Sequence, residues 1–268
     1  MHLSYYCSAP FQTACGYEAA ACGFENGLFH SLTFSMAPSE TRNRFMVLFD
    51  IDGTLLRRAG AHHRDALIEA VRRHTGLETT TDGIALHGML DTEILRRMLR
   101  NAGAPEAMIR RSLPAIIASA QAIYVRRCPD LRRNVCPGVR RFLERLRRQG
   151  VPLGLVTGNL TRIGWKKVER AGLRKYFRFG AFGEMQPDRA RLVRLAVRTA
   201  RARGWIRHNR QVWLIGDSPA DVRAARTAGV RVVAVLTGVC SRKELAAELP
   251  DILVDDLRTL RPEQLLQP

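Results

Sequence analysis

Apolar residues follow two alternating patterns along the chain after residue 44. Short continuous apolar runs alternate with stretches in which apolar residues recur every three or four positions. The first pattern is typical of buried strands and the second of amphipathic helices. We predict strands at residues 45–50, 151–157, 177–182, 211–216, 230–236 and 252–254. Since strands that alternate with helices form parallel sheets, we expect an α/β fold with a Rossmann-like core and helices on both faces.

A long stretch between the first two predicted strands, residues 57–137, carries helical periodicity and no strand pattern. Apolar stripes predict one helix around residues 67–71 and a second around 94–99. Residues 105–127 predict one or two more helices, which Pro114 could kink. We therefore expect an all-helical cap domain at 57–137, inserted into a core made of residues 44–56 and 138–268.

Residues 1–43 differ in composition from the rest of the chain. No lysine or arginine occurs before Arg42, whereas the remainder is rich in arginine. Glu18 and Glu25 interrupt the segment and its start lacks positive charge, which is unlike a signal peptide. We expect a disordered extension or a mis-assigned start, with Met36 or Met46 as the true first residue.

The chain carries a large positive charge, with 43 basic residues against 25 acidic ones and a net charge of +18. Such a charge suggests nucleic acid, anionic membranes or phosphorylated small molecules as partners. The excess is almost all arginine, and basic residues do not alternate with aromatic ones as in a groove for single strands. We interpret it as coding bias on solvated helix faces, so we expect no nucleic-acid partner.

The six cysteines form no Cys-x-x-C pair and have no histidine at metal-site spacing. We expect reduced thiols and, without a secretory signal, a cytoplasmic protein. No segment approaches the roughly 20 apolar residues that a membrane-spanning helix needs, so no membrane partner is expected. The sequence leaves the oligomeric state open.

Oxygen-bearing side chains follow three of the predicted strands. Asp50 and Asp52 end the first, Thr157 ends the second, and Asp217 and Asp221 follow a later one. Each motif alone also fits an ordinary turn or a helix cap. The carboxyl ends of parallel strands share one edge where ligands bind, so we expect these side chains to converge. Four carboxylates would repel one another without a cation, and hard oxygen ligands suit Mg²⁺.

These motifs carry a resemblance to a known family. The run Asp50-Ile51-Asp52-Gly53-Thr54-Leu55, then Thr157-Gly158-Asn159, then G-D-x-x-x-D from Asp217 resembles the haloacid dehalogenase superfamily of phosphohydrolases. It is most similar to the phosphoglycolate phosphatase-like branch, which has a helical C1-type cap after the first motif. The resemblance covers about residues 44–260, and Gly88-Met89-Leu90-Asp91 is similar to a G-x-x-D segment of such caps.

The resemblance implies a Mg²⁺-dependent phosphatase that hydrolyses a small phosphate monoester. Asp50 would attack phosphorus and form an aspartyl-phosphate. Asp52 would be the general acid and base. Mg²⁺ would be held by the Asp50 carboxylate, the backbone carbonyl of Asp52 and Asp217, with Asp221 in support.

The resemblance also implies a phosphate site that contains a cation. Thr157 and the N–H of Gly158 would hold a phosphoryl oxygen. The family places a lysine before the strand that ends in Gly-Asp, whereas this chain reads Gln186-Pro187-Asp188-Arg189. We take Arg189 as the first choice for this cation, because guanidinium binds phosphate well, and Lys167 as the alternative.

Several related activities can be weighed from the sequence. A dehalogenase has no alkoxide to protonate, so Asp52 argues against it. A phosphonate-cleaving relative needs a cap lysine for a Schiff base, and no lysine precedes Lys166. A phosphosugar mutase would use the same Asp50 and Asp52 and stays open, as does, from a different class, a basic non-enzymatic nucleic-acid-binding protein. The substrate, for instance 2-phosphoglycolate, is suggested by analogy alone.

Overall fold

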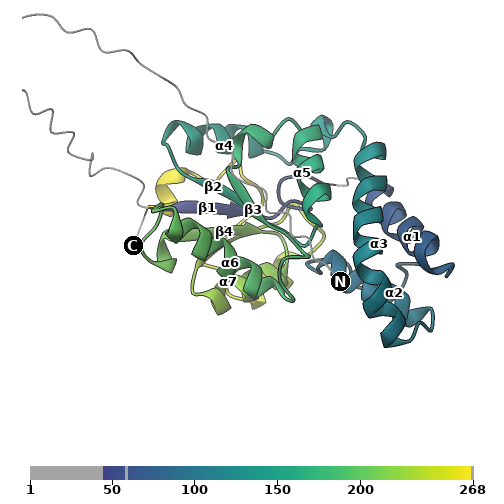
Figure 1. The fold of residues 1–268 in the computed structure, drawn as a ribbon. Coiled ribbons are helices and arrows are strands. Elements are labelled where there is room, and N and C mark those ends of the chain that lie inside the picture. The colour runs from purple at the N-terminus through teal and green to yellow at the C-terminus, as the bar shows by residue number, and fades with distance from the viewer. Residues whose placement is uncertain (1–44, 58–59, 267–268) are drawn as a thin grey trace, which may run out of the picture. The chain divides into compact units, whose positions relative to one another are not determined.

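A computed structural model describes residues 45–57 and 60–266 (Figure 1), so the expected extension at 1–43 lies outside the described residues. Six strands form one parallel sheet in the order β3-β2-β1-β4-β5-β6. They are β1 (Met46–Phe49), β2 (Leu153–Val156), β3 (Phe179–Ala181), β4 (Val212–Gly216), β5 (Arg231–Val235) and β6 (Ile252–Val254). Every predicted strand is present, because each apolar run in the sequence is a buried or half-buried strand of this sheet.

Eight α-helices and four short 3-10 helices lie in the described part of the chain. The α-helices are α1 (His62–Thr75), α2 (Asp91–Asn101), α3 (Glu106–Arg127), α4 (Val139–Arg148), α5 (Thr161–Arg170), α6 (Arg189–Ala202), α7 (Pro219–Ala228) and α8 (Arg242–Ala247). The 3-10 helices are η1 (Arg132–Asn134), η2 (Arg174–Tyr176), η3 (Asn209–Gln211) and η4 (Pro262–Leu265). None of the described helices has both the length and the apolar character of a membrane span.

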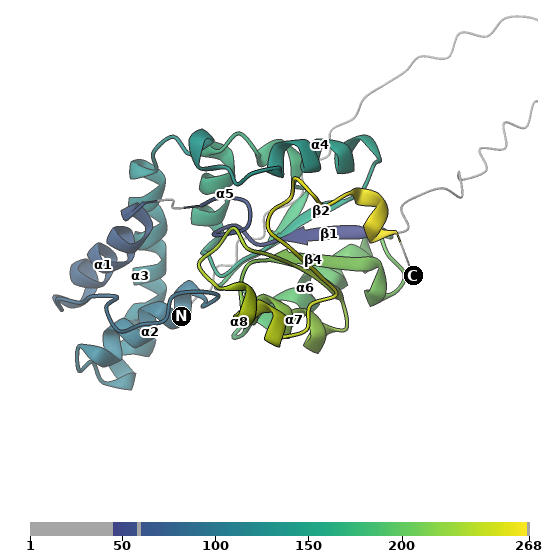
Figure 2. The same cartoon turned by 180° about the vertical axis from the view of Figure 1, so that it is seen from behind.

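Both faces of the sheet are covered by helices. Val47 and Phe49 of β1 belong to a hydrophobic cluster with α4 and α5, whereas Met46 and Leu48 belong to a second cluster with α6 and α7. This division follows from the alternation of side chains along a strand. Figures 1 and 2 show α4 and α6 on opposite sides of the sheet. The predicted fold class, a Rossmann-like parallel sheet with helices on both faces, is confirmed.

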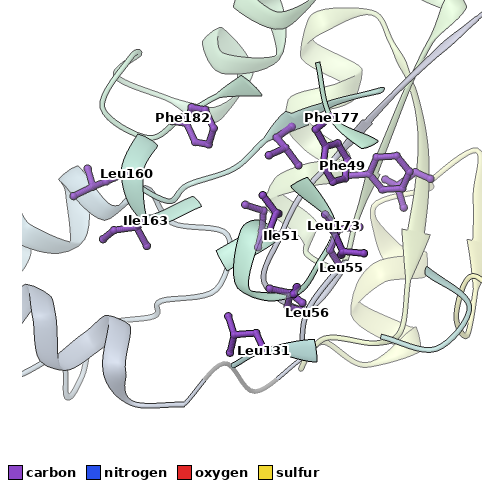
Figure 3. Close-up of a cluster of buried hydrophobic side chains, with 14 of the residues drawn as sticks. Phe49, Ile51, Leu55, Leu56, Leu131, Leu160, Ile163, Leu173, Phe177 and Phe182 are labelled. Carbon is purple, nitrogen blue, oxygen red and sulfur yellow. The ribbon is translucent and has the colours of Figure 1, made fainter. Parts of the chain in front are cut away.

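The first cluster reaches up to the end of β1, where the predicted site begins. Phe49 packs edge-on against Phe142 and Phe177, with ring centroids 6.4 and 5.9 Å apart. Figure 3 shows Phe49 near Ile51 and Leu55, which are both fully buried. Ile51 therefore anchors the turn after β1 in the core. Its two neighbours in the sequence are the aspartates predicted to be catalytic.

The segment between β1 and α4 holds α1, α2 and α3, which we call the helical insert. Within its described residues there is no β-strand, as predicted. α1 packs against α3, and α3 also contacts α5 of the core. Residues 106–127 form one helix with Pro114 inside it. The expected boundaries of a cap domain at 57 and 137 stay a prediction.

The N-terminus of helix α5 is not capped by the side chain of its own N-cap residue. The N–H of Leu160, at its N-cap, donates to Asp91 Oδ2 (2.8 Å), and the N–H of Arg162 donates to Gln121 Oε1 (2.8 Å). Both acceptors belong to the helical insert. The N–H of Thr161, between these two donors, donates to Glu184 Oε1 (2.9 Å), which lies outside the insert. The free N–H groups at the start of a helix need such partners, so the insert and the core together cap this helix.

The packing of Phe142 allows a test of the core. Phe142 is 1% exposed and lies on α4, away from the predicted site. We expect Phe142→Ala to lower the free energy of unfolding by about 3–5 kcal/mol, because it leaves a cavity beside Phe49. Urea unfolding followed by circular dichroism measures this. Met185→Ala, at a residue that is 41% exposed, is the control and should change the midpoint little. Equal shifts for the two variants would contradict this account of the core.

Candidate active site

A cavity of about 1060 Å³ lies at the carboxyl ends of β1, β2 and β4, with part of its wall contributed by the helical insert. The residues proposed from the sequence that line it are Asp50, Asp52, Thr157, Gly158, Lys167, Arg189 and Asp217. Asp221, the remaining one, is fully buried. The predicted side chains therefore share one region, as the carboxyl edge of a parallel sheet leads one to expect.

Three of the aspartates form a tight acidic cluster. Asp50 follows β1, Asp217 follows β4 and Asp221 lies in the first turn of α7, and each offers a carboxylate oxygen within 4.8 Å of the others. Burial, with Asp221 nearby, raises the pKa of Asp50 to about 7, although Arg189 opposes this. Burial and the charge of Asp50 raise the pKa of Asp217 well above its ordinary value. A cation among these carboxylates would relieve their repulsion.

The carboxylate of Asp217 is held in a narrow cradle. Thr54 Oγ1 donates a hydrogen bond to Asp217 Oδ1 (3.0 Å). A Cβ atom at Gly53 would lie 2.0 Å from Asp217 Oδ2, and one at Gly238 would lie 1.8 Å from it. Gly53 also has a φ of +87°, which favours glycine. Any larger residue at either position would displace Asp217.

Asp221 links a helix cap to a buried cation. Its Oδ2 accepts hydrogen bonds from the hydroxyl (2.6 Å) and the N–H (3.2 Å) of Ser218, which form a capping box at the start of α7. Its Oδ1 accepts a hydrogen bond from Arg189 Nε (2.7 Å). Asp221 is thus both the first-turn acid expected from the sequence and a partner of Arg189.

Arg189 connects the acidic cluster to the helical insert. Its Nη2 lies 2.8 Å from Asp50 Oδ1 and 2.7 Å from Asp221 Oδ1, and Nη1 donates to the carbonyl of Gly88 (3.2 Å). Burial lowers the pKa of Arg189, but Asp221 and Asp50 outweigh it and raise the pKa. Nη2 makes ion pairs but no hydrogen bond of good geometry to the described residues. It is a buried donor beside the predicted nucleophile.

Lys167 pairs with the other catalytic candidate, Asp52. Its Nζ lies 2.8 and 2.6 Å from the two carboxylate oxygens of Asp52 and 2.7 Å from Asn159 Oδ1. The Lys167 side chain is 1% exposed, whereas that of Asp52 is 44% exposed and so reaches the cavity. Burial would raise the pKa of Asp52, but Lys167 and His63 outweigh it and lower the pKa. The structure therefore brings both candidate cations to the site, each beside a different aspartate.

The loop after β2 lies against the helical insert. Thr157 Oγ1 is buried and accepts a hydrogen bond from Asn159 Nδ2 (2.7 Å). The carbonyl of Gly158 accepts a hydrogen bond from the N–H of Asp91 (2.9 Å). A Cβ atom at Gly158 would lie 2.2 Å from the carbonyl oxygen of Met89. Glycine at this position thus lets the backbone of the insert approach the loop.

Several residues of the site had no predicted role. Asn159 follows Thr157-Gly158 directly, and its Nδ2 donates to Asp52 Oδ2 (2.8 Å), so its position in the motif was the available signal. His63 in α1 lies between Lys167 and Asp91, with contacts of 3.2 and 2.9 Å. Nothing in the sequence distinguishes His63 from the adjacent His62 or from His74 in the same helix.

Known proteins are similar to this chain in sequence and in fold. The family model described as haloacid dehalogenase-like hydrolase matches residues 47–226. A phosphoglycolate phosphatase of Pseudomonas putida is 29% identical over 235 residues, which cover 81% of this chain and 78% of that protein.

Two solved structures resemble the fold. One, described as a predicted phosphoglycolate phosphatase from Haemophilus somnus, has a TM-score of 0.60 at 20% identity and covers 80% of this chain and 96% of its own. The other, β-phosphoglucomutase from Clostridium difficile, has a TM-score of 0.61 at 18% identity and covers 82% of this chain and 94% of its own. At these identities the two likenesses concern the fold alone.

The family match extends over well more than half of the chain and includes the motifs at Asp50, Thr157 and Asp217. Phosphatases of this family act on phosphorylated substrates. The alternative of a basic, non-enzymatic nucleic-acid-binding protein therefore loses its support. The chain belongs to the haloacid dehalogenase-like hydrolase family, and within it the chain is phosphoglycolate phosphatase-like.

Proposed function

We propose that the protein is a Mg²⁺-dependent phosphatase that hydrolyses a small phosphate monoester, with Asp50 as nucleophile and Asp52 as general acid and base. One observation carries this proposal. Two aspartates two residues apart face the same cavity, and each is held by a different buried cation, Arg189 for Asp50 and Lys167 for Asp52. This separation allows one carboxylate to attack while the other transfers protons.

The acidic cluster supports a divalent cation site. Its donors are carboxylate oxygens, which Mg²⁺ prefers. The pKa values of Asp50 and Asp217 are raised by burial and by the neighbouring carboxylates, and a cation would compensate this negative charge. We propose that Asp50, Asp217 and the backbone carbonyl of Asp52 hold the ion, while Asp221 supports them through Arg189. When bound, Mg²⁺ would neutralise charge on the phosphoryl oxygens.

We propose that the phosphoryl group lies between Asp50 and the loop after β2. Arg189 Nη2 is a buried donor that forms ion pairs with Asp50 and Asp221 but no hydrogen bond of good geometry within the described part of the chain. Thr157 Oγ1 uses its lone pairs to accept from Asn159, which leaves its hydrogen for a phosphoryl oxygen. Together with the N–H of Gly158, these groups would bind the oxygens and orient phosphorus toward Asp50.

The reaction would proceed in two steps. In the first, a carboxylate oxygen of Asp50 bonds to phosphorus as the bond to the leaving oxygen breaks, and Asp52 gives its proton to that oxygen. In the second, Asp52 takes a proton from water, the water oxygen attacks phosphorus, and the bond to Asp50 breaks to release phosphate. Lys167 favours the ionised, proton-accepting form of Asp52, whereas a dianionic phosphoryl group nearby would favour the protonated form.

The substrate class follows from the relatives and stays a proposal. The Pseudomonas putida relative is named a phosphoglycolate phosphatase. We therefore propose a small acidic phosphate monoester, with 2-phosphoglycolate as the first candidate. A phosphosugar mutase would use the same two aspartates and is the alternative. The described free thiols of Cys128, Cys136 and Cys240 suit a reducing compartment, which supports our proposal of a cytoplasmic location.

The role of Asp50 can be tested directly. With Mg²⁺, the wild type should release phosphate from 2-phosphoglycolate and other monoesters ranked by kcat/KM. We expect Asp50→Asn to lower kcat by about 10³-fold or more, because the amide is a poor nucleophile. Asp65→Asn, at a side chain of α1 that is 54% exposed, is the matched control and should retain activity. Formation of an isomeric sugar phosphate without net phosphate release would instead favour the mutase.

The cradle around Asp217 predicts the effect of one methyl group on metal binding. We expect Gly238→Ala to weaken Mg²⁺ binding by about 10–100-fold, because the new Cβ would overlap Asp217 Oδ2. Isothermal titration of the chelator-treated protein measures this. Val239→Ala changes the next, exposed residue and should bind Mg²⁺ as the wild type does. Unchanged affinity in Gly238→Ala would remove Asp217 from the proposed ligands.

Arg189 and Lys167 are predicted to have separable effects. Arg189→Ala should weaken competitive inhibition by inorganic phosphate by about 10–100-fold, since it removes a charged hydrogen-bond donor. Arg189→Lys should recover part of this loss because it keeps the charge. Lys167→Ala should lower turnover with a smaller effect on phosphate binding. If Arg189→Ala and Lys167→Ala both kept wild-type turnover and phosphate inhibition, neither assignment would stand.

A further inference from the structure

A chain of polar contacts runs from the helical insert to Asp52. Asp91 is the first residue of α2, and its Oδ2 lies 2.9 Å from His63 Nε2. His63 Nδ1 lies 3.2 Å from Lys167 Nζ, and Lys167 in turn holds both carboxylate oxygens of Asp52. The four residues come from α2, α1, α5 and the turn after β1. Asp91 is thus connected to the proposed acid and base through two intermediate side chains, His63 and Lys167.

The donors and acceptors in this chain fix the form of His63. The ammonium group of Lys167 has three hydrogens and no acceptor, so Nδ1 of His63 must accept from it. Nε2 then carries the ring hydrogen and donates to the carboxylate of Asp91. Four acceptor atoms lie within hydrogen-bond distance of the three hydrogens of Lys167, namely both carboxylate oxygens of Asp52, Asn159 Oδ1 and His63 Nδ1. His63 is therefore one of three residues that hold the ammonium group in place.

Packing prevents His63 from leaving this position easily. Its side chain is 18% exposed, and its ring lies edge-on to Tyr124 of α3, with centroids 5.6 Å apart. Asp91 is anchored to the core, because its carboxylate also accepts the N–H of Leu160 (2.8 Å) and its own N–H donates to Gly158 (2.9 Å). Leu160 directly precedes α5, the helix that carries Lys167. A hydrogen bond thus fixes Asp91 to the start of the helix that carries Lys167.

We propose that His63 and Asp91 are positioning residues for Asp52, and that they act on it through Lys167. Loss of the His63 acceptor would leave Lys167 with the Asp52 and Asn159 oxygens alone, so its ammonium group would turn toward them and shift the Asp52 carboxylate that it holds. Asp52 is 44% exposed and depends on Lys167 and Asn159 for its orientation. This proposal rests on the proposed function, in which Asp52 protonates the leaving oxygen.

The dependence of kcat/KM on the leaving group tests this role. For the wild type and each variant, log(kcat/KM) is plotted against the pKa of the leaving alcohol, from 4-nitrophenyl phosphate to alkyl phosphates. A nitrophenolate leaves without a proton, whereas an alkoxide needs one from Asp52. We expect His63→Ala to lower kcat/KM by about 10–100-fold for alkyl phosphates and by less than about threefold for 4-nitrophenyl phosphate. The slope of the plot therefore becomes steeper.

Three further variants complete the experiment. His63→Gln keeps an acceptor and a donor and should restore most of the wild-type slope. Asp91→Asn should steepen the slope less than His63→Ala does. His62→Ala, at the exposed neighbouring histidine, should match the wild type. Because His63 is proposed to act through Lys167, the double variant His63→Ala/Lys167→Ala should be no slower than Lys167→Ala alone.

Two results would overturn the proposal. An equal loss of kcat/KM for all leaving groups would indicate a general structural role for His63. A further loss in the double variant beyond Lys167→Ala would indicate that His63 contacts the substrate itself. Failure of the proposed function is a different outcome, in which the wild type shows no Asp50-dependent hydrolysis of any of these esters. Circular dichroism of each variant at the assay temperature confirms that the compared proteins are folded.

Discussion

Repulsion between three buried carboxylates is the constraint around which this site is built. Asp50, Asp217 and Asp221 approach within 4.8 Å, where like charges in a poorly solvated environment are costly. One guanidinium, that of Arg189, contacts two of them. The missing side chain at Gly238 leaves room for the carboxylate of Asp217, and the hydroxyl of Thr54 donates a hydrogen bond to it. The close approach of these three carboxylates is explained if a divalent cation balances their charge.

The two proposed catalytic aspartates experience opposite electrostatic environments although a single residue separates them. The pKa of Asp50 is raised by burial and by the neighbouring Asp221, whereas the pKa of Asp52 is lowered because Lys167 outweighs the effect of burial. Environments that separate the pKa values of two carboxyl groups are typical of sites in which the groups have different tasks. A cation bound near Asp50 would lower its pKa again and favour the ionised nucleophile.

The architecture could be predicted well from the sequence, because apolar runs and the alternation of side chains in Asp50-Ile51-Asp52 are local signals. Ile51 is buried in the core while both aspartates line the cavity, as alternation requires. The pairing of Lys167 with Asp52 could not be predicted, since it joins residues 115 positions apart. The same holds for His63, which acquires its partners only when the insert packs on α5. Long-range polar contacts of this kind leave no periodicity in the sequence.

The start of α5 has a consequence for how this fold can be recombined. The N–H groups of Leu160 and Arg162 donate to Asp91 and Gln121 of the helical insert, whereas that of Thr161 donates to Glu184. A chimera that received the insert of a relative without matching acceptors would leave two N–H groups at the start of this core helix, which carries Lys167, without these partners. Exchange of inserts between family members, by evolution or by engineering, is therefore restricted by helix capping as well as by the choice of substrate.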